Sequence, residues 1–327
     1  MSTASAVEAE RGGADFVPKL SVVICTHRRP KGLEALLNSL VPQVTGRPER
    51  EIVVVNDGTH DDAYAAVVAA FGNAIRYEAL RIPSGIAVAR NCTAELARGT
   101  FMIFTDDDCV VPPAWLNWVE ARLTAHPELD VIAGTTRPHD LEHANFVGRM
   151  QAAFDLLPRP YSHEGGMYSF ITACLAVRAD LFRKVGGFRT DANFASAGED
   201  TDLSFRLARA RARIRLDPDW WVAHALATSV RSEYRRFYRY GYSNGLMALS
   251  HESPKAFAYH LRRVDRGFVA AVWDHFRYNR TRAASVDANP LLKLAYRATD
   301  AYIRTGLDRG ASAAIRQHRA KAATAAN

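Results

Sequence analysis

The chain has 327 residues, of which 48% are hydrophobic, 10% aromatic and 24% charged, a composition that excludes collagen, a coiled coil and a wholly disordered chain. The net charge of +7 is unevenly distributed, because residues 225–327 hold 18 Lys or Arg and 7 Asp or Glu while the rest of the chain has more acids than bases. A mildly acidic body with a basic C-terminal part predicts an anionic partner for that part, such as nucleic acid, phosphate or a membrane surface.

Targeting and redox signals are weak in this sequence. No stretch of about 18 apolar residues occurs, so we expect no transmembrane span. Residues 1–17 are small and polar and carry acids, which predicts a disordered lead-in and not a signal peptide. The four cysteines are scattered without a CxxC pair, which argues against a zinc finger or a disulfide framework. These features predict a cytoplasmic protein.

Predicted strands and helices alternate in chain order. Residues 20–25 form a short β-branched run that is typical of a strand buried on both faces. Leucines at positions 33, 36, 37 and 40 then have the spacing of an amphipathic helix. The pattern continues with a strand at 52–55, a helix at 61–71, a weaker strand at 74–77, a helix at 86–97, a strand at 101–104 and a helix at 113–125.

This alternation predicts βαβ units, a mostly parallel sheet and helices on both faces of the sheet. After about residue 225 the pattern becomes helical, basic and aromatic, with helices expected near 229–250 and 256–278. We therefore expect an α/β domain over residues 18–228 and a basic helical extension over residues 229–327. Ligands of such sheets bind beyond the carboxyl ends of the strands, so the polar loops at 26–30, 56–59 and 105–109 carry the candidate site.

The strongest local signal is the run Phe104-Thr-Asp106-Asp107-Asp108, directly after a buried strand. In an extended backbone Asp106 and Asp108 lie on one side and Asp107 on the other. Carboxylate oxygens suit Mg²⁺ or Mn²⁺, which bridge protein carboxylates to phosphates. A solvated acidic turn is the alternative interpretation, and the position of the run at the ligand edge of the sheet favours the metal.

Four other signals each have an ordinary structural explanation. Asp57-Gly58 is a common turn, and Arg90-Asn91 follows a glycine at a helix start. The acids of Gly198-Glu199-Asp200-Thr-Asp202 complement a helix dipole, and a lone histidine such as His224 is more often a core or surface residue than a metal ligand. No GxGxxG and no Walker GxxxxGK[ST] sequence occurs, so dinucleotide and P-loop sites are not indicated.

The order of these pieces is more specific than any one of them. From Lys19 to His224 the chain reads SVVICT, VVVNDGT, SGIAVARN, FTDDD and GEDTDL, with the histidine last. This order resembles the inverting family 2 glycosyltransferases, which have a GT-A fold, that is, the nucleotide-diphospho-sugar transferase fold with a mostly parallel sheet flanked by helices. The resemblance covers about two thirds of the chain and excludes the basic C-terminal part.

The resemblance implies roles for matching positions. Asp57 looks like the residue that accepts a pyrimidine ring N–H, and Asp200 in the E-D pair looks like the catalytic base, with Glu199 beside it. Asp106 and Asp108 match the DxD pair, with His224 placed where many members have a metal ligand. The implied nucleotide-sugar site comprises Thr26, Arg28, Asp57, Arg90, Asn91, Asp106 and Asp107, and the implied Mn²⁺ or Mg²⁺ site comprises Asp106, Asp108 and His224.

Helical geometry distinguishes the three acids at the start of the predicted helix. Leu203 is expected to be buried, and Asp200, three residues before it, therefore turns toward the protein. Glu199 is the second choice for the base, whereas Asp202 is expected on an exposed side. The positive end of the helix is expected to keep Asp200 ionised at neutral pH, as a base must be.

The sequence thus predicts a metal-dependent inverting transfer of a sugar from a UDP- or dTDP-sugar to an acceptor hydroxyl of a cell-envelope glycan or lipid or of a secondary metabolite. One alternative is a nucleotidyltransferase that makes sugar nucleotides, although the loop after the first strand lacks the glycines and lysines that a triphosphate needs. Another is a nucleic-acid-binding protein that uses the aromatic and basic tail. The tail either caps the body as packed helices or contacts the inner face of a membrane from the cytoplasm.

Overall fold

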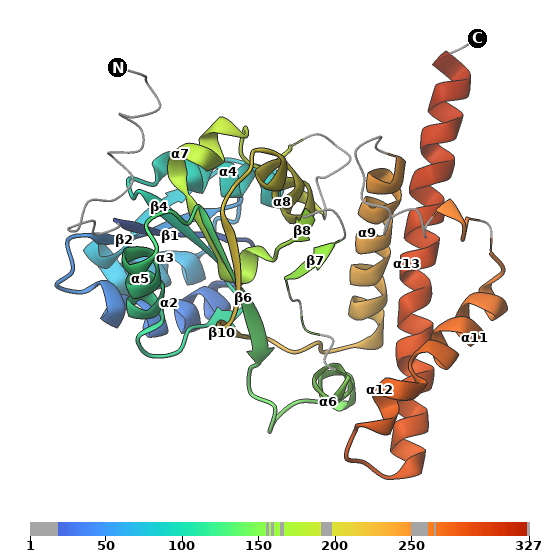
Figure 1. Ribbon diagram of the computed structural model, residues 1–327. Coiled ribbons are helices and arrows are strands. Elements are labelled where there is room, and N and C mark those ends of the chain that lie inside the picture. The colour runs from blue at the N-terminus through green and yellow to red at the C-terminus, as the bar shows by residue number, and fades with distance from the viewer. Residues whose placement is uncertain are drawn as a thin grey trace.

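The computed structural model describes residues 19–154, 157, 160–163, 167–190, 198–249, 261–264 and 266–325, so the predicted lead-in at 1–17 lies outside the described residues. The first two thirds of the described chain form an α/β body, and the last third forms a group of helices beside it (Figure 1). The strands are β1 (Leu20–Thr26), β2 (Arg50–Asn56), β3 (Arg76–Ala79), β4 (Phe101–Asp106), β5 (Cys109–Val110), β6 (Val131–Pro138), β7 (Tyr161–His163), β8 (Met167–Ser169), β9 (Leu175–Arg178) and β10 (Ile214–His224).

Eight of these strands form one sheet in the order β3-β2-β1-β4-β9-β6-β10-β5, and β7 pairs with β8. Strands β3, β2, β1 and β4 are parallel, which confirms the predicted βαβ arrangement. Strand β9 runs antiparallel to both β4 and β6, and β5 runs antiparallel to β10. The sheet is therefore mixed, and its polar loops after β1, β2 and β4 lie at one edge because parallel strands end together.

Helices cover both faces of the sheet (Figure 1). Leucines of α2 and aromatic residues of α3 and α5 bury one face together with the strands, and α4, α7 and α8 bury the other. The four leucines predicted from their spacing, at 33, 36, 37 and 40, are all fully buried. The helices of the body are α2 (Pro30–Val44), α3 (Asp62–Phe71), α4 (Ile86–Leu96), α5 (Trp115–Ala125), α6 (Phe146–Ala153), α7 (Ala179–Lys184) and α8 (Glu199–Arg209).

Two predicted boundaries are wrong for local reasons. Strand β3 begins at Arg76 and not at Ala74, because residues 72–74 form a 3-10 turn that starts at Gly72 with a φ of 46°. Helix α5 begins at Trp115 and not at Pro113, because Ala114 has a φ of 61°, a left-handed conformation that a right-handed helix cannot include.

The C-terminal part consists of α9 (Val230–Leu249), α11 (Phe268–Tyr278), α12 (Arg280–Ala284) and α13 (Pro290–Ala325). Helix α9 confirms the helix predicted near 229–250. The helix predicted near 256–278 is wrong in its described first part, because residues 262–264 form a turn and α11 begins only at Phe268; residues 250–260 lie outside the described residues. Among the described residues, no helix is both long enough and apolar enough to cross a bilayer.

Glycines bring α9 and α13 together at close range. A Cβ atom at Gly241 would lie 2.1 Å from the Leu307 carbonyl oxygen, and one at Gly310 would lie 2.0 Å from the Tyr238 carbonyl oxygen. The two backbones therefore touch where side chains normally separate helices. Farther along, Val147, Met150 and Phe154 of the body share a buried cluster with Phe237 and with residues of α13, so the helical part is joined to the body.

Candidate active site at the sheet edge

The middle acid of the triplet faces the protein interior. Asp107 accepts hydrogen bonds from Thr26 Oγ1 at 2.7 Å and from Arg29 Nη1 at 3.1 Å, and it is buried. Burial raises the pKa of the Asp107 carboxyl to about 6. The Thr26 hydroxyl also lies 2.7 Å from the Tyr64 hydroxyl. The predicted arrangement, with Asp106 and Asp108 on one side and Asp107 on the other, is wrong, because Asp107 and Asp108 share Arg29 Nη1 while Asp106 binds Arg90. Asp107 and Thr26 instead join the ends of β1 and β4.

Asp108 and His224 come together as the sequence predicts. The two side chains lie on adjacent chain segments because β5 pairs with the end of β10, and Ala225 N donates to the Asp108 carbonyl oxygen at 2.9 Å. His224 Nε2 lies 3.6 Å from Asp108 Oδ1, and His224 Nδ1 lies 2.8 Å from the Ala225 carbonyl oxygen. A proton on Nδ1 satisfies that carbonyl and leaves Nε2 with a lone pair that points toward Asp108.

These atoms fit a divalent cation. Asp108 Oδ1, His224 Nε2 and Cys109 Sγ lie within 4.8 Å of one another, and the Asp108 Oδ1 atom is buried without a hydrogen-bond donor among the described residues. A buried carboxylate oxygen without a donor carries a desolvation cost that a bound cation removes. Carboxylate and imidazole are ligands that Mn²⁺ and Mg²⁺ sites in proteins accept, whereas burial holds the pKa of the Cys109 thiol well above its usual value.

Asp106 belongs to a different group from Asp108. The Arg90 guanidinium donates to Asp106 Oδ1 at 2.7 Å through Nη2 and to Glu199 Oε1 at 2.5 Å through Nη1. Arg90 is buried, so it holds the DxD segment and the first turn of α8 at a fixed separation. The prediction placed Asp106 among the metal ligands, but the structure instead shows it paired with arginine and outside the cluster of Asp108, Cys109 and His224.

The first turn of α8 differs from the prediction in two acids. Asp200, expected to turn toward the protein, is the most exposed of the three acids. Asp202 was expected to be exposed, yet it is 6% exposed, because Arg206 Nε donates to it at 2.8 Å and Arg189 lies beside it. Those cations offset the cost of burying its charge. Leu203 is fully buried, as expected, and Glu199 is buried on Arg90, whereas Asp200 is only partly buried.

The protonation of Asp200 also differs from the prediction. Burial raises the pKa of the Asp200 carboxyl to about 7, and the Glu199 carboxylate adds to the rise while Arg90 opposes it. The Thr201 backbone N–H donates to Asp200 Oδ1 at 2.7 Å. This helix-terminal hydrogen bond, which favours the ionised form, does not outweigh the loss of solvation. The Asp200 carboxyl therefore titrates near neutral pH, whereas the sequence predicts that it is fully ionised at that pH.

The other three predicted nucleotide-binding residues, Asp57, Asn91 and Arg28, also have partners in the protein. Asp57 is buried and accepts from the backbone N–H groups of Ser84, at 2.6 Å, and Gly85, at 3.0 Å, which fixes the start of α4. The Asn91 amide bonds both the N–H and the carbonyl of Phe188. Arg28 has a φ of 56°, and its backbone N–H donates to Thr59 Oγ1 at 3.3 Å. Of these, only Arg28 is exposed.

Sequence reasoning missed Arg29. Its Nη1 atom donates to Asp108 Oδ2 at 2.6 Å as well as to Asp107, so one guanidinium balances two carboxylates of the triplet. Three adjacent carboxylates need such a counter-charge, and the two consecutive arginines shortly after β1, Arg28 and Arg29, are the sequence feature that indicates one. The side chain is 56% exposed, so Arg29 meets the triplet from the solvent side.

Helix α9 also reaches this site. Its residues at 233, 236, 240, 243 and 247 share one face, opposite the face that carries Gly241 and Gly245 against α13. Met247 forms a buried cluster with Phe205 of α8. At the other end of this face the pKa of Glu233 is raised by burial and partly lowered by Arg236 and His224. The face therefore runs from the side of His224 to α8.

Tyr240 lies midway along that face, between Glu233 and Met247. It is 39% exposed, and the Arg236 guanidinium lies 5.9 Å from its ring centroid. Burial of part of the side chain raises the pKa of the Tyr240 phenol. The positive charge of Arg236 lowers this pKa, and the negative charges of Asp200 and Glu199 raise it further. The phenol thus lies close enough to the acid pair to sense its charge.

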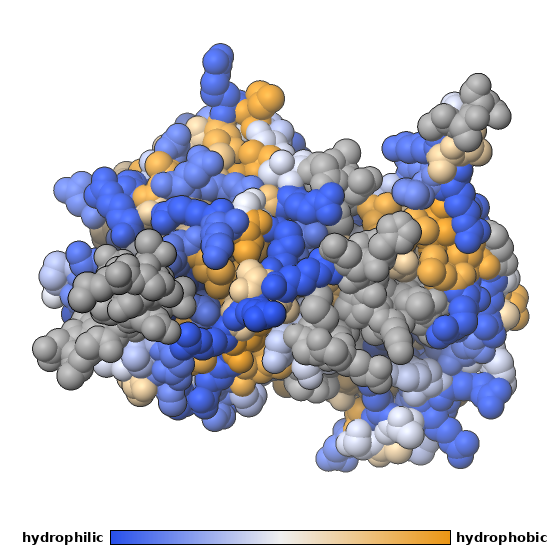
Figure 2. Space-filling model, turned by 45° about the horizontal axis from the view of Figure 1, so that its top comes forward, coloured by the Kyte–Doolittle hydropathy of each residue, from blue (hydrophilic) through white to orange (hydrophobic). Residues whose placement is uncertain are grey.

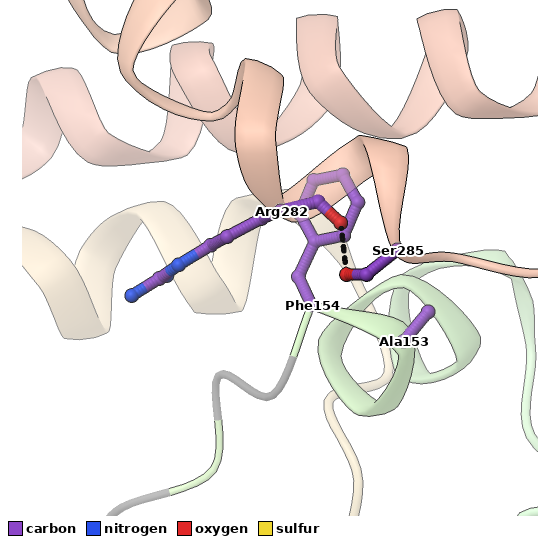
Figure 3. Close-up of a pocket in the computed structure, with 4 residues that line it drawn as sticks. All are labelled: Ala153, Phe154, Arg282 and Ser285. Carbon is purple, nitrogen blue, oxygen red and sulfur yellow. Dashed lines mark hydrogen bonds between the residues drawn. The ribbon is translucent and has the colours of Figure 1, made fainter.

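A separate cavity of about 230 Å³ lies between the end of α6 and α12, lined by Ala153, Phe154, Arg282 and Ser285 (Figure 3). Ser285 Oγ donates to the Arg282 carbonyl oxygen at 2.9 Å, within the last turn of α12 at the wall of the cavity. None of the predicted site residues lines this cavity. The candidate active site is instead the polar edge of the sheet, where Asp108, His224, Arg90 and Asp200 are gathered.

Known proteins resemble this chain over the same region. The model of the family described as glycosyl transferase family 2 matches residues 21–186, just over half of the chain. The O-antigen biosynthesis protein RfbC of Myxococcus xanthus is 26% identical over 237 residues, 66% of this chain. The pre-mycofactocin glycosyltransferase of Mycobacterium tuberculosis is 32% identical over 248 residues, 72% of this chain. The chain spans only 18% and 49% of these two relatives.

Among solved structures, the mannosyltransferase PcManGT of Pyrobaculum calidifontis, in complex with GDP-Man and Mn²⁺, has a similar fold. The TM-score is 0.52 at 19% sequence identity, and the match covers 94% of this chain and 76% of that one. This likeness, with the mixed sheet and its two helical faces, establishes a GT-A fold. By the family match over residues 21–186, the chain belongs to glycosyl transferase family 2.

Proposed function

We propose that this protein transfers a sugar from a nucleoside diphosphate to an acceptor hydroxyl, with a divalent cation and with inversion at the anomeric carbon. The observation that carries the proposal is the placement of two groups at one sheet edge. The buried Asp108 oxygen and His224 Nε2 form a cation-binding pair, and Arg90 ties the neighbouring Asp106 to the acid pair of α8.

Asp108 and His224 are the residues that would hold the cation, which supplies Lewis-acid stabilisation of the negative charge on the leaving diphosphate. The imidazole favours Mn²⁺ over Mg²⁺. Asp200 accepts the proton of the acceptor hydroxyl as that oxygen attacks the face of the sugar opposite the leaving group. Glu199, held by Arg90, keeps the first turn of α8 in place. A single displacement needs no covalent intermediate, and it inverts the anomeric centre.

The proposed donor carries a pyrimidine base, UDP in preference to dTDP or GDP. Asp57 supports this choice, because its two backbone hydrogen bonds fix the carboxylate and leave each oxygen a second lone pair for a ring N–H. Thr26 and Asp107 hold the adjoining strands together, and Arg28 is exposed beside them. The mannosyltransferase with a similar fold binds GDP-Man, so GDP-sugars are the donors to test against UDP-sugars.

The proposed acceptor enters between α8 and α9. Tyr240 and Arg236 lie on the α9 face whose Met247 packs against Phe205 of α8, and the partly exposed ring of Tyr240 offers a flat surface to a hydroxylated ring. The names of the two relatives, an O-antigen biosynthesis protein and a pre-mycofactocin glycosyltransferase, support an envelope glycan or lipid or a small natural product as the acceptor class.

The test is a panel of UDP-, dTDP- and GDP-sugars incubated without acceptor, in which slow release of free sugar is measured with Mn²⁺, with Mg²⁺ and with excess EDTA. We expect metal-dependent release that is fastest from a UDP-sugar, and NMR of the first product should show the inverted anomer. Asp108→Ala should abolish the release, whereas Asp62→Ala, an exposed acid of α3, should retain it. Full turnover in EDTA, or GDP binding ten times tighter than UDP by calorimetry, would contradict the proposal.

A further inference from the structure

The largest exposed apolar side chains of the described C-terminal part gather on α11 and the first turns of α13. Val269 and Leu291 are each 80% exposed, Tyr278 64% and Trp273 57%. Leu294 is also half exposed. Figure 2 shows hydrophobic residues on this helical part of the molecule, at the right of the view. Exposed groups of this size in one segment mark an interaction surface more often than a folding requirement.

Helix α11 packs on α13 through both apolar and polar groups. Ala271 is buried, the centroid of the Phe276 ring lies 4.0 Å from the Arg297 guanidinium, and His275 Nε2 lies 2.9 Å from Asp308 Oδ2, to which Arg263 also donates. The outer face carries Val269, Trp273 and Arg277 at a spacing of four residues. The Trp273 ring stacks on Phe276 of the same helix, with the centroids 6.0 Å apart, yet Trp273 remains 57% exposed. Since an amphipathic helix normally buries its apolar stripe, packing within the described chain does not explain why Val269 and Trp273 face outward.

The surroundings of this stripe are basic. Residues 261–302 contain eight Lys or Arg and four Asp or Glu. Of those acids Asp300 is fully buried, and Asp274 is paired with Arg263 and Arg266, so the excess of positive charge falls on the other basic residues of this range. Arg277 and Arg280 are exposed, and the Arg282 guanidinium lies 5.8 Å from the centroid of the Tyr278 ring.

Aromatic rings and aliphatic side chains set among arginines match the chemistry of a lipid headgroup layer. Tryptophan and tyrosine favour the boundary between acyl chains and water, and arginine pairs with lipid phosphates. We propose that the outer face of α11, with Leu291 and Leu294, binds the surface of a membrane that contains anionic lipids. In this arrangement α11 lies in the plane of the interface.

The test is flotation of the full chain with vesicles of phosphatidylcholine alone and of phosphatidylcholine mixed with phosphatidylglycerol. We expect flotation with the mixed vesicles only, weakened by added salt, and a blue shift of tryptophan emission that Trp273→Phe removes. Trp273→Ala should lower the partition about tenfold, since an exposed ring loses its burial. Arg277→Gln should lower it about fivefold, as removal of one charge near an anionic surface predicts.

Two matched variants of the body serve as controls. Leu141→Ala removes an exposed leucine and Arg47→Gln an exposed arginine, and neither should change flotation. Equal unfolding temperatures for Trp273→Ala and the parent show that the exposed ring has no folding role. Flotation that Trp273→Ala leaves unchanged, or no flotation with anionic vesicles at low salt, overturns the proposal. So does a dimer in sedimentation velocity that Trp273→Ala dissociates, because this face is then an interface between copies.

Discussion

The sheet edge and the C-terminal helices use charged and apolar residues in opposite ways. At the sheet edge, acidic side chains lie close together and two arginines each donate hydrogen bonds to two of them. Arg29 binds Asp107 and Asp108, and Arg90 binds Asp106 and Glu199. In the helices, the charged network around Asp308 is turned inward while Trp273 faces solvent. The first arrangement holds acidic side chains in fixed positions, and the second leaves apolar side chains exposed to solvent.

The largest expected effect at the sheet edge is the loss of the base. Asp200→Asn keeps the shape of the side chain and removes its basicity, so turnover should fall by ~10²–10⁴-fold while donor binding changes little. Rates of sugar release and calorimetric donor affinity measure the two quantities. If Asp200→Asn keeps most of its turnover and Glu199→Gln loses it, the roles of the two acids must be exchanged.

The next effect concerns the proposed cation. His224→Ala removes the imidazole that faces Asp108, and the affinity for Mn²⁺ should fall by about 10–100-fold. Titration of Mn²⁺ in the presence of UDP measures this affinity. His126→Ala, an exposed histidine after α5, should leave the affinity unchanged. An unchanged Mn²⁺ affinity in His224→Ala would remove His224 from the site.

The raised pKa of Asp200 predicts a pH dependence. The base acts only when ionised, so with a pKa of about 7 the rate should rise through neutrality and fall about tenfold for each pH unit below it. A profile of the release rate against pH, measured at saturating Mn²⁺, gives the apparent pKa of this acid limb. A rate that stays constant down to about pH 5 would indicate that the base titrates at the ordinary value of an aspartate.

The comparison also explains what the sequence could and could not predict. Buried strands such as β1 and the meeting of Asp108 with His224 follow from local patterns and from motif order. The burial of Asp202 was not predicted, because charged side chains are seldom buried unless cations compensate. Arg206, four residues later on the same helix, could have been read as a partner from the sequence, whereas the contacts of Arg189 with Asp202 and of Arg206 with the Val185 carbonyl oxygen depend on the fold. The outward orientation of Val269 and Trp273 on α11 could not be predicted for a similar reason. The opposite face of the helix is stabilised by Arg263 and Asp308, whose contact is not evident from the sequence.

A smaller effect tests how the helices hold together. In Gly310→Ala the new methyl group would meet the Tyr238 carbonyl oxygen, so α9 and α13 must separate, at a cost of about 1–3 kcal/mol in the free energy of unfolding. Gly267→Ala, at a glycine with open space around it, should change the free energy of unfolding by less than about 1 kcal/mol. Denaturant unfolding measures both variants, and equal values would show that the glycine contact is not tight in solution.

The smallest effect tests whether the two regions meet at the acid pair. Tyr240→Arg places a cation on the α9 face toward Asp200 and Glu199, and a nearby positive charge favours the ionised carboxylate. The acid limb of the pH profile should therefore move down by about half a unit to one unit, since solvent screens a partly exposed charge. Tyr238→Arg is the matched control, because the Tyr238 backbone lies against Gly310 on the α13 side of α9 and its ring is exposed to a similar extent, 37% against 39%. A shift in Tyr240→Arg alone assigns α9 to the acceptor side of the active site, whereas equal profiles for the two variants would confine catalysis to the α/β body.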